Sequence, residues 1–489
     1  MKAIIAIDQG TTSTRALLFS LSGKKIFSSQ LEFKQHFPKD GWVEHDPNEI
    51  LKKTIKVTKN VIEKSRKLKI EIKTLGITNQ RETTIVWNKK NGKPIYNAIV
   101  WQDRRTEGYC KKIKKKEKII RNKTGLFIDP YFSATKIKWI LDNVKGAKNL
   151  LEKNQLLFGT IDSFLIWNFT EGKIHATDAT NASRTMLFNL KKNKWDDHIL
   201  KILKIKKNIL PVVKNSADNF GFTSKKILGK KIPISAVLGD QQAAAVGQVC
   251  FEKGSVKTTY GTGAFVIMNT GKSILYSKNK LITTICYRIN NKSTYALEGS
   301  IFIAGAGVQW LRDKIKLINN AYETEKIAGL KKTNSGVYLV PAFTGLGAPY
   351  WNTNSRGLIT GLSRNSDWKD LVRAVLESVA YQTFDLFDSM RKDGLRPKIV
   401  KVDGGMVKNN WFSQFLSEIL NTKVLRPKIE ESTALGVAFL AGYQVGIYKS
   451  LNDIKSKWKK NRVFIPKMNK SLRNKLLQGW KQAIRKTLA

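Results

Sequence analysis

A short apolar run, a turn rich in glycine and threonine, and a second apolar run occur together twice, once near the start of each half of the chain. In the first copy, the mostly β-branched run Ile4–Ile7 leads through Asp-Gln-Gly-Thr-Thr towards the apolar run Ala16–Phe19. In the second copy, the run before Tyr260 leads through Gly261–Gly263 into residues 264–268, which are apolar again. β-Branched runs bounded by turn residues predict buried strands. We therefore expect a strand, turn and strand in each half, and the recurrence favours a duplicated domain with a ligand between the copies.

The residues of the first turn are suited to binding phosphate. Gly10 allows a ligand to approach the backbone, and the N–H groups and hydroxyls that follow it can hold phosphate oxygens. Asp8, at the end of the first strand, can reach a hydrated Mg²⁺ ion. For this segment alone, an ordinary hairpin with a turn aspartate is an equal alternative. The second copy of the pattern favours phosphate binding.

Length and composition indicate a globular protein of two domains. A chain of 489 residues exceeds the roughly 250–300 residues that one core supports. We place the domains at residues 1–247 and 248–489. No apolar run approaches the ~18 residues of a membrane span, so we expect a cytoplasmic protein without a membrane segment. The three cysteines, Cys110, Cys250 and Cys286, are widely spaced, which predicts neither a disulfide framework nor a zinc site.

The chain carries 87 basic and 38 acidic residues, a net charge of +49. A nucleic-acid-binding protein concentrates basic residues on one face or arm, whereas lysine is scattered here through nearly every polar segment. Beside the densest run, Lys111–Lys116, the apolar residues Cys110, Ile113 and Ile120 recur at helical spacing, which indicates a solvated helix with one buried stripe. We favour a bias of the whole composition over a dedicated surface for polyanions, which remains the alternative.

Polar and aromatic residues at predicted strand ends in the first half are candidates for a substrate site. Arg81 and Glu82 follow an apolar run and could bind the hydroxyls of a small polyol, although a surface ion pair is the simpler interpretation for this pair alone. Trp101 ends another apolar run and could form an apolar wall, or it could belong to the core. Tyr131 precedes a predicted helix over 132–141, so its hydroxyl is free to face a pocket.

A strand from Ile232 followed by a helix start places Asp240 at the junction. A carboxylate at a strand end can act as the general base for a hydroxyl nucleophile, and helix capping is the alternative role. In the second half, small residues around Gly305 begin a helix that a flat group could approach. The turn Asp403–Gly405 could lie under adenine and ribose, with Asn409 free to form hydrogen bonds, or it could be a plain turn from strand to helix. The last helix carries four residues at core spacing: Leu472, Leu476, Trp480 and Ile484.

Together these motifs resemble the FGGY family of carbohydrate kinases, which shares the ATPase fold of actin, Hsp70 and hexokinase. Residues 8–13 are similar to the first phosphate loop, residues 260–263 to the second, and residues 403–405 to the adenosine motif. Residues 131–143 and 357–377 are similar to signature patterns of the family. The resemblance covers nearly the whole chain. It implies an α/β fold of two duplicated actin-like ATPase (ribonuclease H-like) domains with a ligand cleft between them.

Asn79–Thr83, with Trp101 and Tyr131, most resembles the family members that act on glycerol. The resemblance implies ATP-dependent phosphorylation of glycerol to sn-glycerol 3-phosphate, with ATP and Mg²⁺ required and Asp240 as the catalytic base. Implied glycerol-binding residues are Arg81, Glu82, Trp101, Tyr131, Asp240, Gln241 and Phe265. Implied nucleotide-binding residues are Thr11, Thr12, Ser13, Arg15, Thr262, Gly305, Gln309, Gly405 and Asn409. Asp8, through water, and Asp240 are the candidate metal-binding residues.

Two other functions stay open at this point. One is a kinase of another polyol or a ketose. The other is a nucleic-acid-binding or scaffolding protein that retains only the ATPase fold, although the intact Asp8, Asp240 and both glycine and threonine turns favour a catalyst. The resemblance also implies a homodimer or homotetramer. Family members inhibited by fructose 1,6-bisphosphate carry a glycine-rich loop ending in arginine, whereas residues 228–231 read Leu-Gly-Lys-Lys here. Lysine lacks the planar fork of arginine, so the resemblance does not extend to that regulation.

Overall fold

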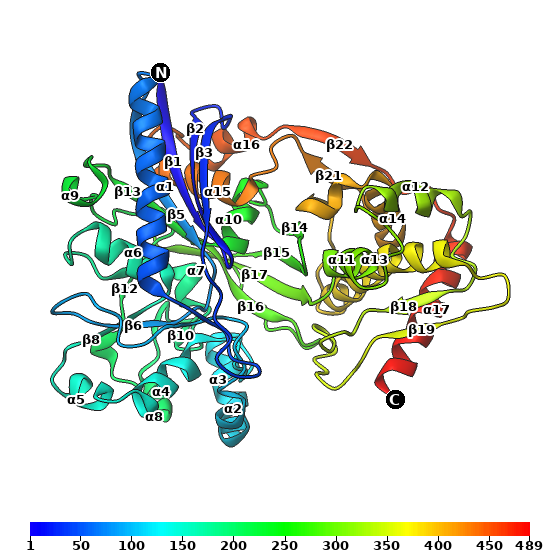
Figure 1. Ribbon diagram of the computed structural model, residues 1–489, viewed down its shortest axis with the longest axis horizontal. Helices are drawn as coiled ribbons and strands as arrows, with labels where there is room; N and C mark the ends of the chain where they lie inside the picture. The colour runs from blue at the N-terminus through cyan, green and yellow to red at the C-terminus, as the bar shows by residue number, and fades with distance from the viewer.

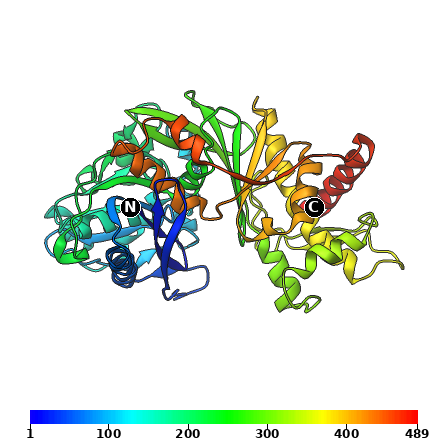
Figure 2. The same ribbon diagram turned by 90° about the horizontal axis from the view of Figure 1, so that it is seen from above.

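Two mixed β-sheets, one in each half of the chain, organise the computed structural model, which describes residues 1–489. The sheet of the first half has the strand order β13-β5-β1-β2-β3. The sheet of the second half has the order β16-β17-β15-β14-β20-β21-β22. Seen from above, the two halves form two lobes side by side (Figure 2).

The strands of the first sheet are β1 (Lys2–Gln9), β2 (Ser13–Ser20), β3 (Lys25–Glu32), β5 (Glu71–Asn79) and β13 (Ile234–Gly239). β1 is antiparallel to β2 and parallel to β5, and β5 is parallel to β13. The register aligns Gln9 with Asn79 and Asn79 with Gly239. The polar segments that follow these three strands therefore start at the same edge of the sheet.

The strands of the second sheet are β14 (Ser255–Tyr260), β15 (Ala264–Gly271), β16 (Ile282–Ile289), β17 (Lys292–Ile301), β20 (Ile399–Asp403), β21 (Val424–Pro427) and β22 (Lys460–Phe464). β14 is antiparallel to β15 and parallel to β20. Thr259 aligns with Asp403, so the turn at Gly261 and the turn at Gly404 lie at one edge. Both predicted pairs of strands around a glycine and threonine turn are confirmed.

Helices surround the sheets (Figure 1). In the first half they are α1 (Pro47–Lys67), α2 (Glu107–Ile113), α3 (Glu117–Thr124), α4 (Ser133–Asn143), α5 (Ala147–Glu152), α6 (Ile161–Phe169), α7 (Ala179–Ala182), α8 (Asp197–Leu203), α9 (Lys225–Leu228) and α10 (Asp240–Gly247). In the second half they are α11 (Gly305–Asp313), α12 (Glu323–Leu330), α13 (Trp368–Lys392), α14 (Asn410–Leu420), α15 (Ser432–Gln444), α16 (Leu451–Lys457) and α17 (Lys470–Leu488). No helix is both long enough and apolar enough to cross a membrane.

Short strands and 3₁₀ turns complete the chain. The short strands are β4 (Glu44–His45), β6 (Ile85–Asn88), β7 (Ala98–Ile99), β8 (Leu156–Gly159), β9 (Ala176–Asp178), β10 (Phe188–Asn189), β11 (Lys194–Trp195), β12 (Val212–Lys214), β18 (Tyr338–Val340) and β19 (Leu358–Thr360). The 3₁₀ turns are η1 (Lys114–Lys116), η2 (Lys207–Ile209) and η3 (Gly405–Lys408).

One helix of the second half packs against the sheet of the first half. α15 packs against β1, β5 and β13, and its most extensive contact is with α10. Glycine makes that contact close: a Cβ at Gly247 would lie 1.9 Å from the Ser432 carbonyl oxygen, and one at Gly436 would lie 1.8 Å from the Ala243 carbonyl oxygen. In Figure 1, α15 accordingly lies beside β2 and β3, strands of the first half of the chain. α10 and α15 thus fix the relation between the two halves beside the end of β13.

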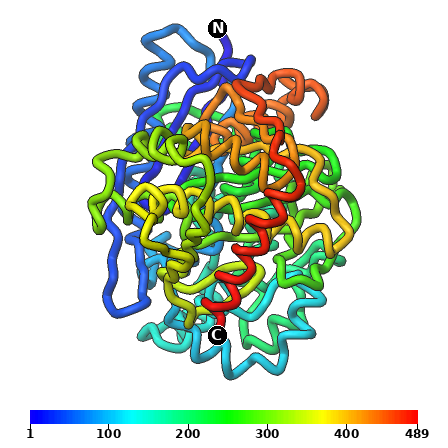
Figure 3. The backbone as a smooth tube through the Cα atoms, turned by 90° about the vertical axis from the view of Figure 1, so that its right-hand side faces the viewer, coloured from blue at the N-terminus to red at the C-terminus, as the bar shows by residue number.

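Two sequence predictions outside the site are wrong in part. The helix predicted around Lys111–Lys116 is divided into α2, η1 and α3, although Cys110 and Ile120 are buried as expected. On α17, Leu476, Trp480 and Ile484 are buried, but Leu472 is 39% exposed because the helix begins only two residues earlier, at Lys470. α17 runs down the outside of the second half to the C-terminus, with the N-terminus at the opposite end of the molecule (Figure 3).

Candidate functional site

Asp240 lies where β13 gives way to α10. Helix capping, the alternative role considered for Asp240, is wrong, because Gly239 holds the N-cap position and Asp240 is the first helical residue. Its Oδ1 atom accepts hydrogen bonds from the Gln241 backbone N–H (2.6 Å) and lies 3.1 Å from the Arg81 Nε atom. Its Oδ2 atom has no hydrogen-bond partner in the chain, and its side chain is 30% exposed. The carboxylate is therefore held through one oxygen and open at the other, as a general base requires.

Arg81 and Glu82 do not form a surface ion pair, since they are only 3% and 1% exposed. The Arg81 guanidinium donates to both carboxylate oxygens of Glu298, at 2.5 and 2.9 Å. Arg184 donates to Glu82 (2.6 Å) and to Glu298 (3.1 Å). Glu82 also has a positive φ of 60°, which is uncommon for a residue with a side chain and is typical of functional sites.

These four side chains form a buried ion cluster that joins the two halves. Arg81, Glu82 and Arg184 come from the first half, whereas Glu298 belongs to β17 of the second sheet. Burial raises the pKa of the Glu82 carboxyl, and the Arg184 charge opposes that rise. Burial also acts on Glu298, but the charges of Arg184 and Arg81 outweigh it and lower the pKa of Glu298. Glu298 is therefore an ionised anchor for two arginines.

Sequence reasoning did not identify Arg184, Glu298 or Lys257 as site residues. Glu298 lies in the middle of β17, directly after Ala296 and Leu297, and Lys257 lies in β14 between Val256 and Thr258; both are buried. A charged residue in the middle of a predicted strand is the signal that could have identified them, because buried charges are rare unless they are paired. Arg184 gives no such signal, because it follows the short helix α7 in a polar segment.

Aromatic rings gather beside the ion cluster. The ring centroid of Trp101 lies 5.7 Å from that of Tyr131 and 6.2 Å from that of Phe265, both in edge-to-face geometry. The Tyr131 hydroxyl accepts a hydrogen bond from Arg81 at 3.5 Å, and burial raises the pKa of this tyrosine. The Trp101 indole N–H donates to the Thr11 hydroxyl at 3.0 Å, which ties the aromatic wall to the first turn. Apolar rings and charged groups thus face the same small region.

A cavity of about 440 Å³ lies between the second turn and helices α11 and α12. It is lined by five of the predicted nucleotide-binding residues: Thr262, Gly305, Gln309, Gly405 and Asn409. A Cβ atom at Gly405 would meet no atom within 4 Å, so its backbone is open to a ligand. Asn409 is less free than predicted, because it caps α14 through the Phe412 N–H (2.8 Å) and donates to Thr324 (3.1 Å).

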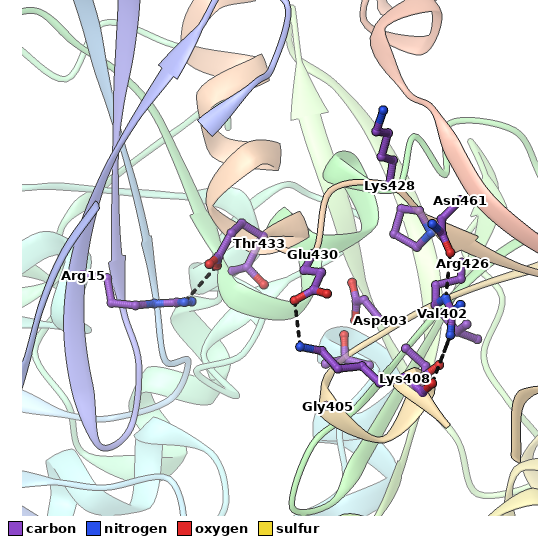
Figure 4. A pocket seen from close by; sticks show the side chains of 15 residues that line it. Arg15, Val402, Asp403, Gly405, Lys408, Arg426, Lys428, Glu430, Thr433 and Asn461 are labelled. Carbon is purple, nitrogen blue, oxygen red and sulfur yellow. Dashed lines mark hydrogen bonds and ion pairs between the residues drawn. The ribbon is translucent and has the colours of Figure 1, made fainter. Parts of the chain in front are cut away.

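A second cavity of about 570 Å³ shares Gly405 and Lys408 with the first. Figure 4 shows Arg15 of β2 on one side of this cavity, and Lys408 and Arg426 on the other. Arg15 is ion-paired with Asp8 and, at 2.8 Å, with Glu431. Thr11, Thr12 and Ser13 line neither cavity; the two threonines lie in the turn between β1 and β2, and Ser13 is the first residue of β2.

The structure contains no group of three or more histidine, cysteine or acidic side chains able to hold a metal ion. Asp8 and Asp240 nevertheless each keep one carboxylate oxygen that accepts no hydrogen bond from the chain. Burial raises the pKa of Asp8, Arg15 lowers it, and the negative charge of Asp240 raises it further. Mg²⁺ prefers one or two carboxylates together with water and phosphate oxygens. The two aspartates fit that ligand set.

Two family models match the chain: the N-terminal domain of the FGGY family of carbohydrate kinases over residues 3–247, and the C-terminal domain of that family over residues 256–445. The chain is 54% identical to the glycerol kinase of Alteromonas mediterranea over 98% of both proteins. It is 52% identical to the glycerol kinase of Coxiella burnetii over 99% of this chain and 97% of that protein.

Among solved structures, the chain matches Plasmodium falciparum glycerol kinase with ADP. The TM-score is 0.95 and the sequence identity 41%, over 100% of this chain and 99% of that one. A gluconate kinase from Lactobacillus acidophilus shares the fold, with a TM-score of 0.89 at 23% identity over 99% and 97% of the two chains. The two-domain α/β fold expected from the sequence is confirmed.

Proposed function

The chain belongs to the FGGY family of carbohydrate kinases, and we propose that it transfers the γ-phosphoryl group of ATP to a terminal hydroxyl of glycerol. The products are sn-glycerol 3-phosphate and ADP. One observation carries the proposal: the open Oδ2 atom of Asp240 lies beside buried charged groups and an aromatic wall, a combination suited to a small polyol. The relatives more than 50% identical over nearly their whole length support glycerol as that polyol.

The acceptor is held by both kinds of group at the site. Arg81, Glu82, Tyr131, Asp240 and Gln241 bind the hydroxyls, and Trp101 and Phe265 contact the carbon chain. The ion cluster with Glu298 supports this assignment, because it fixes Arg81 and Glu82 before a substrate arrives. A pre-organised set of polar groups discriminates strongly against an acceptor that lacks a matching hydroxyl.

Asp240 acts as the general base. Its Oδ2 atom takes the proton of the attacking hydroxyl as the oxygen forms a bond to the γ-phosphorus, while the bond from that phosphorus to the leaving oxygen of ADP breaks. Arg81 holds the other carboxylate oxygen, which keeps Oδ2 directed at the acceptor. Positioning and charge neutralisation supply most of the rate in phosphoryl transfer, and closure of the two domains, residues 1–247 and 248–489, would exclude water.

The nucleotide occupies the second half of the site. Thr262, Gly305, Gln309, Gly405 and Asn409 bind ATP in the 440 Å³ cavity and beside it, and Thr11, Thr12, Ser13 and Arg15 contact its phosphates from the first turn and the start of β2. Asp8, through water, and Asp240 would hold Mg²⁺, which supplies charge neutralisation at the phosphate oxygens. Arg15 would have to exchange a contact with Asp8 or Glu431 for a phosphate oxygen.

A coupled assay of ADP release tests the function. Purified protein is incubated with ATP and Mg²⁺ and with glycerol, xylulose, ribulose or no acceptor. We expect ADP release that depends on glycerol, with a kcat/KM for glycerol far above that for either ketose. Higher kcat/KM with a ketose would identify a different sugar kinase. Absence of turnover with every acceptor, together with retention of nucleic acid at physiological salt, would refute the kinase function.

A further inference from the structure

Lys257 is a buried charge that the proposed reaction does not use. It lies on β14, one strand of the second turn, and is 0% exposed. Its only side-chain hydrogen bond goes from the ammonium to the Gln241 Oε1 atom, at 2.5 Å. No carboxylate oxygen lies within 4.0 Å of the Lys257 Nζ atom, so Lys257 forms no ion pair. A buried ammonium held only by a neutral amide costs stability, so a compensating role at the neighbouring site is expected.

The charge of Lys257 is supported from a distance. Burial lowers the pKa of the Lys257 ammonium, while the carboxylates of Asp403, Asp240 and Glu298 raise it and Arg81 lowers it. The three carboxylates belong to β20 and the start of α10, which both contact β14, and to β17, which β15 separates from β14 in the sheet. The protonated form is therefore favoured by its neighbours even though no single one of them contacts it.

A protonated lysine dictates how the Gln241 amide is turned. An ammonium has three donors and no acceptor, so only the oxygen of the amide can face it. In the planar amide, the Nε2 atom then lies on the side away from Lys257. Gln241 directly follows Asp240 at the start of α10, its side chain is half-buried, and its Nε2 atom has no acceptor in the chain.

We infer that Lys257 is a positioning residue that locks the Gln241 amide with its N–H donors directed at a hydroxyl oxygen of glycerol. This inference rests on the proposed function. A hydroxyl that accepts from Gln241 keeps its own proton, which it can donate to a carboxylate of the site. Without Lys257 no group of the chain holds the amide oxygen away from the acceptor, so the oxygen can replace the N–H donors and compete for that proton.

The test compares Lys257→Met with Lys401→Met. Lys401 is the register partner of Lys257 on β20, and it donates to the backbone oxygens of Gln248 and Val249 rather than to Gln241. In Lys257→Met we expect the KM for glycerol to rise about tenfold, the loss of one well-placed hydrogen bond, with kcat reduced less than threefold and the KM for ATP unchanged. Lys401→Met should leave all three constants within about twofold. A KM for glycerol within twofold of wild type in Lys257→Met would overturn the inference.

A double-mutant cycle separates positioning from a general structural effect. In a Gln241→Ala background, Lys257→Met should cause no further rise in the KM for glycerol, because its effect passes through the amide. The same tenfold rise in that background would show that Lys257 acts independently and would overturn the inference.

A second variant keeps the test decisive if Lys257→Met does not fold. Gln241→Glu retains an acceptor for Lys257 but has no N–H to donate, so the KM for glycerol should rise while the thermal midpoint is preserved. An unchanged KM would overturn the inference. Turnover of glycerol by the wild type tests the proposed function separately, since it does not depend on either variant.

Discussion

Replacing Asp240 with asparagine removes the proposed base while keeping the contacts that position it. The Oδ1 atom accepts from the Gln241 N–H at 2.6 Å and lies 3.1 Å from Arg81, and an asparagine oxygen can make both contacts. The Oδ2 atom, which becomes an amide nitrogen, has no partner in the chain to lose. The substitution also removes a negative charge from the first turn of α10, which costs about 0.3–1 kcal/mol in stability.

The expected kinetic effect is much larger than the effect on stability. A positioned general base contributes about 10²–10⁴-fold to a rate, so kcat should fall by that factor, equivalent to about 3–5 kcal/mol in the barrier. The affinity for glycerol should stay within about threefold of wild type, because Arg81, Glu82 and Tyr131 keep their contacts with one another.

Two measurements check this prediction: kcat from glycerol-dependent ADP release, and the dissociation constant of glycerol from titration calorimetry. Asp197→Asn is the matched control, because Asp197 is also the first residue of a helix, α8, and pairs with Lys207 at 2.9 Å on the surface. The control should retain wild-type kcat. A kcat for Asp240→Asn within tenfold of wild type would refute the role of Asp240 as base.

Three further substitutions test the nucleotide site, the ion cluster and a buried acid. The Cβ atom added by Gly405→Ala would meet no protein atom within 4 Å, so the protein should fold normally. The same atom would occupy the space proposed for ATP, so the KM for ATP should rise severalfold in the ADP-release assay. Glu298→Gln leaves Arg81 and Arg184 buried with too little negative charge, and it should cost about 3 kcal/mol in the free energy of unfolding and raise the KM for glycerol. Burial raises the pKa of the Asp385 carboxyl from 3.8 to about 7, so the wild type loses stability as the pH rises through that interval. Asparagine at this position does not ionise. In thermal unfolding, the stability of Asp385→Asn relative to wild type should therefore increase by on the order of 3 kcal/mol between pH 4 and pH 8.

Each of these has a control and an outcome that contradicts it. Gly108 of α2 is the control, because a Cβ atom there would also meet no atom, and Gly108→Ala should not change the KM for ATP. An equal rise in both variants would contradict the placement of Gly405 in the nucleotide site. Glu63→Gln breaks an exposed pair with Lys67 and should leave the free energy of unfolding nearly unchanged. An equally small effect of Glu298→Gln would contradict the importance of the ion cluster. Tyr350 and Trp480 both donate hydrogen bonds to the Asp385 carboxyl at 2.8 Å. If the stability difference between Asp385→Asn and wild type does not change with pH, the predicted rise in the pKa of Asp385 is contradicted.

The positions of the strand ends could be predicted from the sequence better than the side chains that come into contact there. Periodicity and turn residues locate β1, β5, β13 and β14 because buried strands have a local signature. The partners of Arg81 do not have one: Glu298 lies 217 residues away and reaches Arg81 only because β17 of the second sheet packs against the first half. The surface interpretation of Arg81 and Glu82 was wrong for the same reason, since burial at this site is produced by tertiary contact.

Helix boundaries caused the other error at the site. Aspartate is a favoured N-cap residue, so local preference places Asp240 at the cap. The chain instead uses Gly239 there, whose Cβ would lie 2.7 Å from the Arg81 side chain, and this close approach brings the guanidinium against the carboxylate. The requirement for a glycine one residue earlier depends on Arg81, more than 150 residues away, and no local pattern contains it.

The charges at the site balance one another, in contrast to the large positive charge of the whole chain. The ion cluster of Arg81, Glu82, Arg184 and Glu298 carries two positive and two negative charges, and Lys257 and the partly exposed Asp240 add one of each, so the net charge is 3 − 3 = 0. Buried charges must be compensated in this way because desolvation is costly, whereas exposed lysines are not so constrained. The excess of 87 − 38 = 49 positive charges therefore lies outside this cluster. Lysine-rich composition and kinase activity are thus compatible in one chain, and the charge alone does not favour a nucleic-acid-binding function.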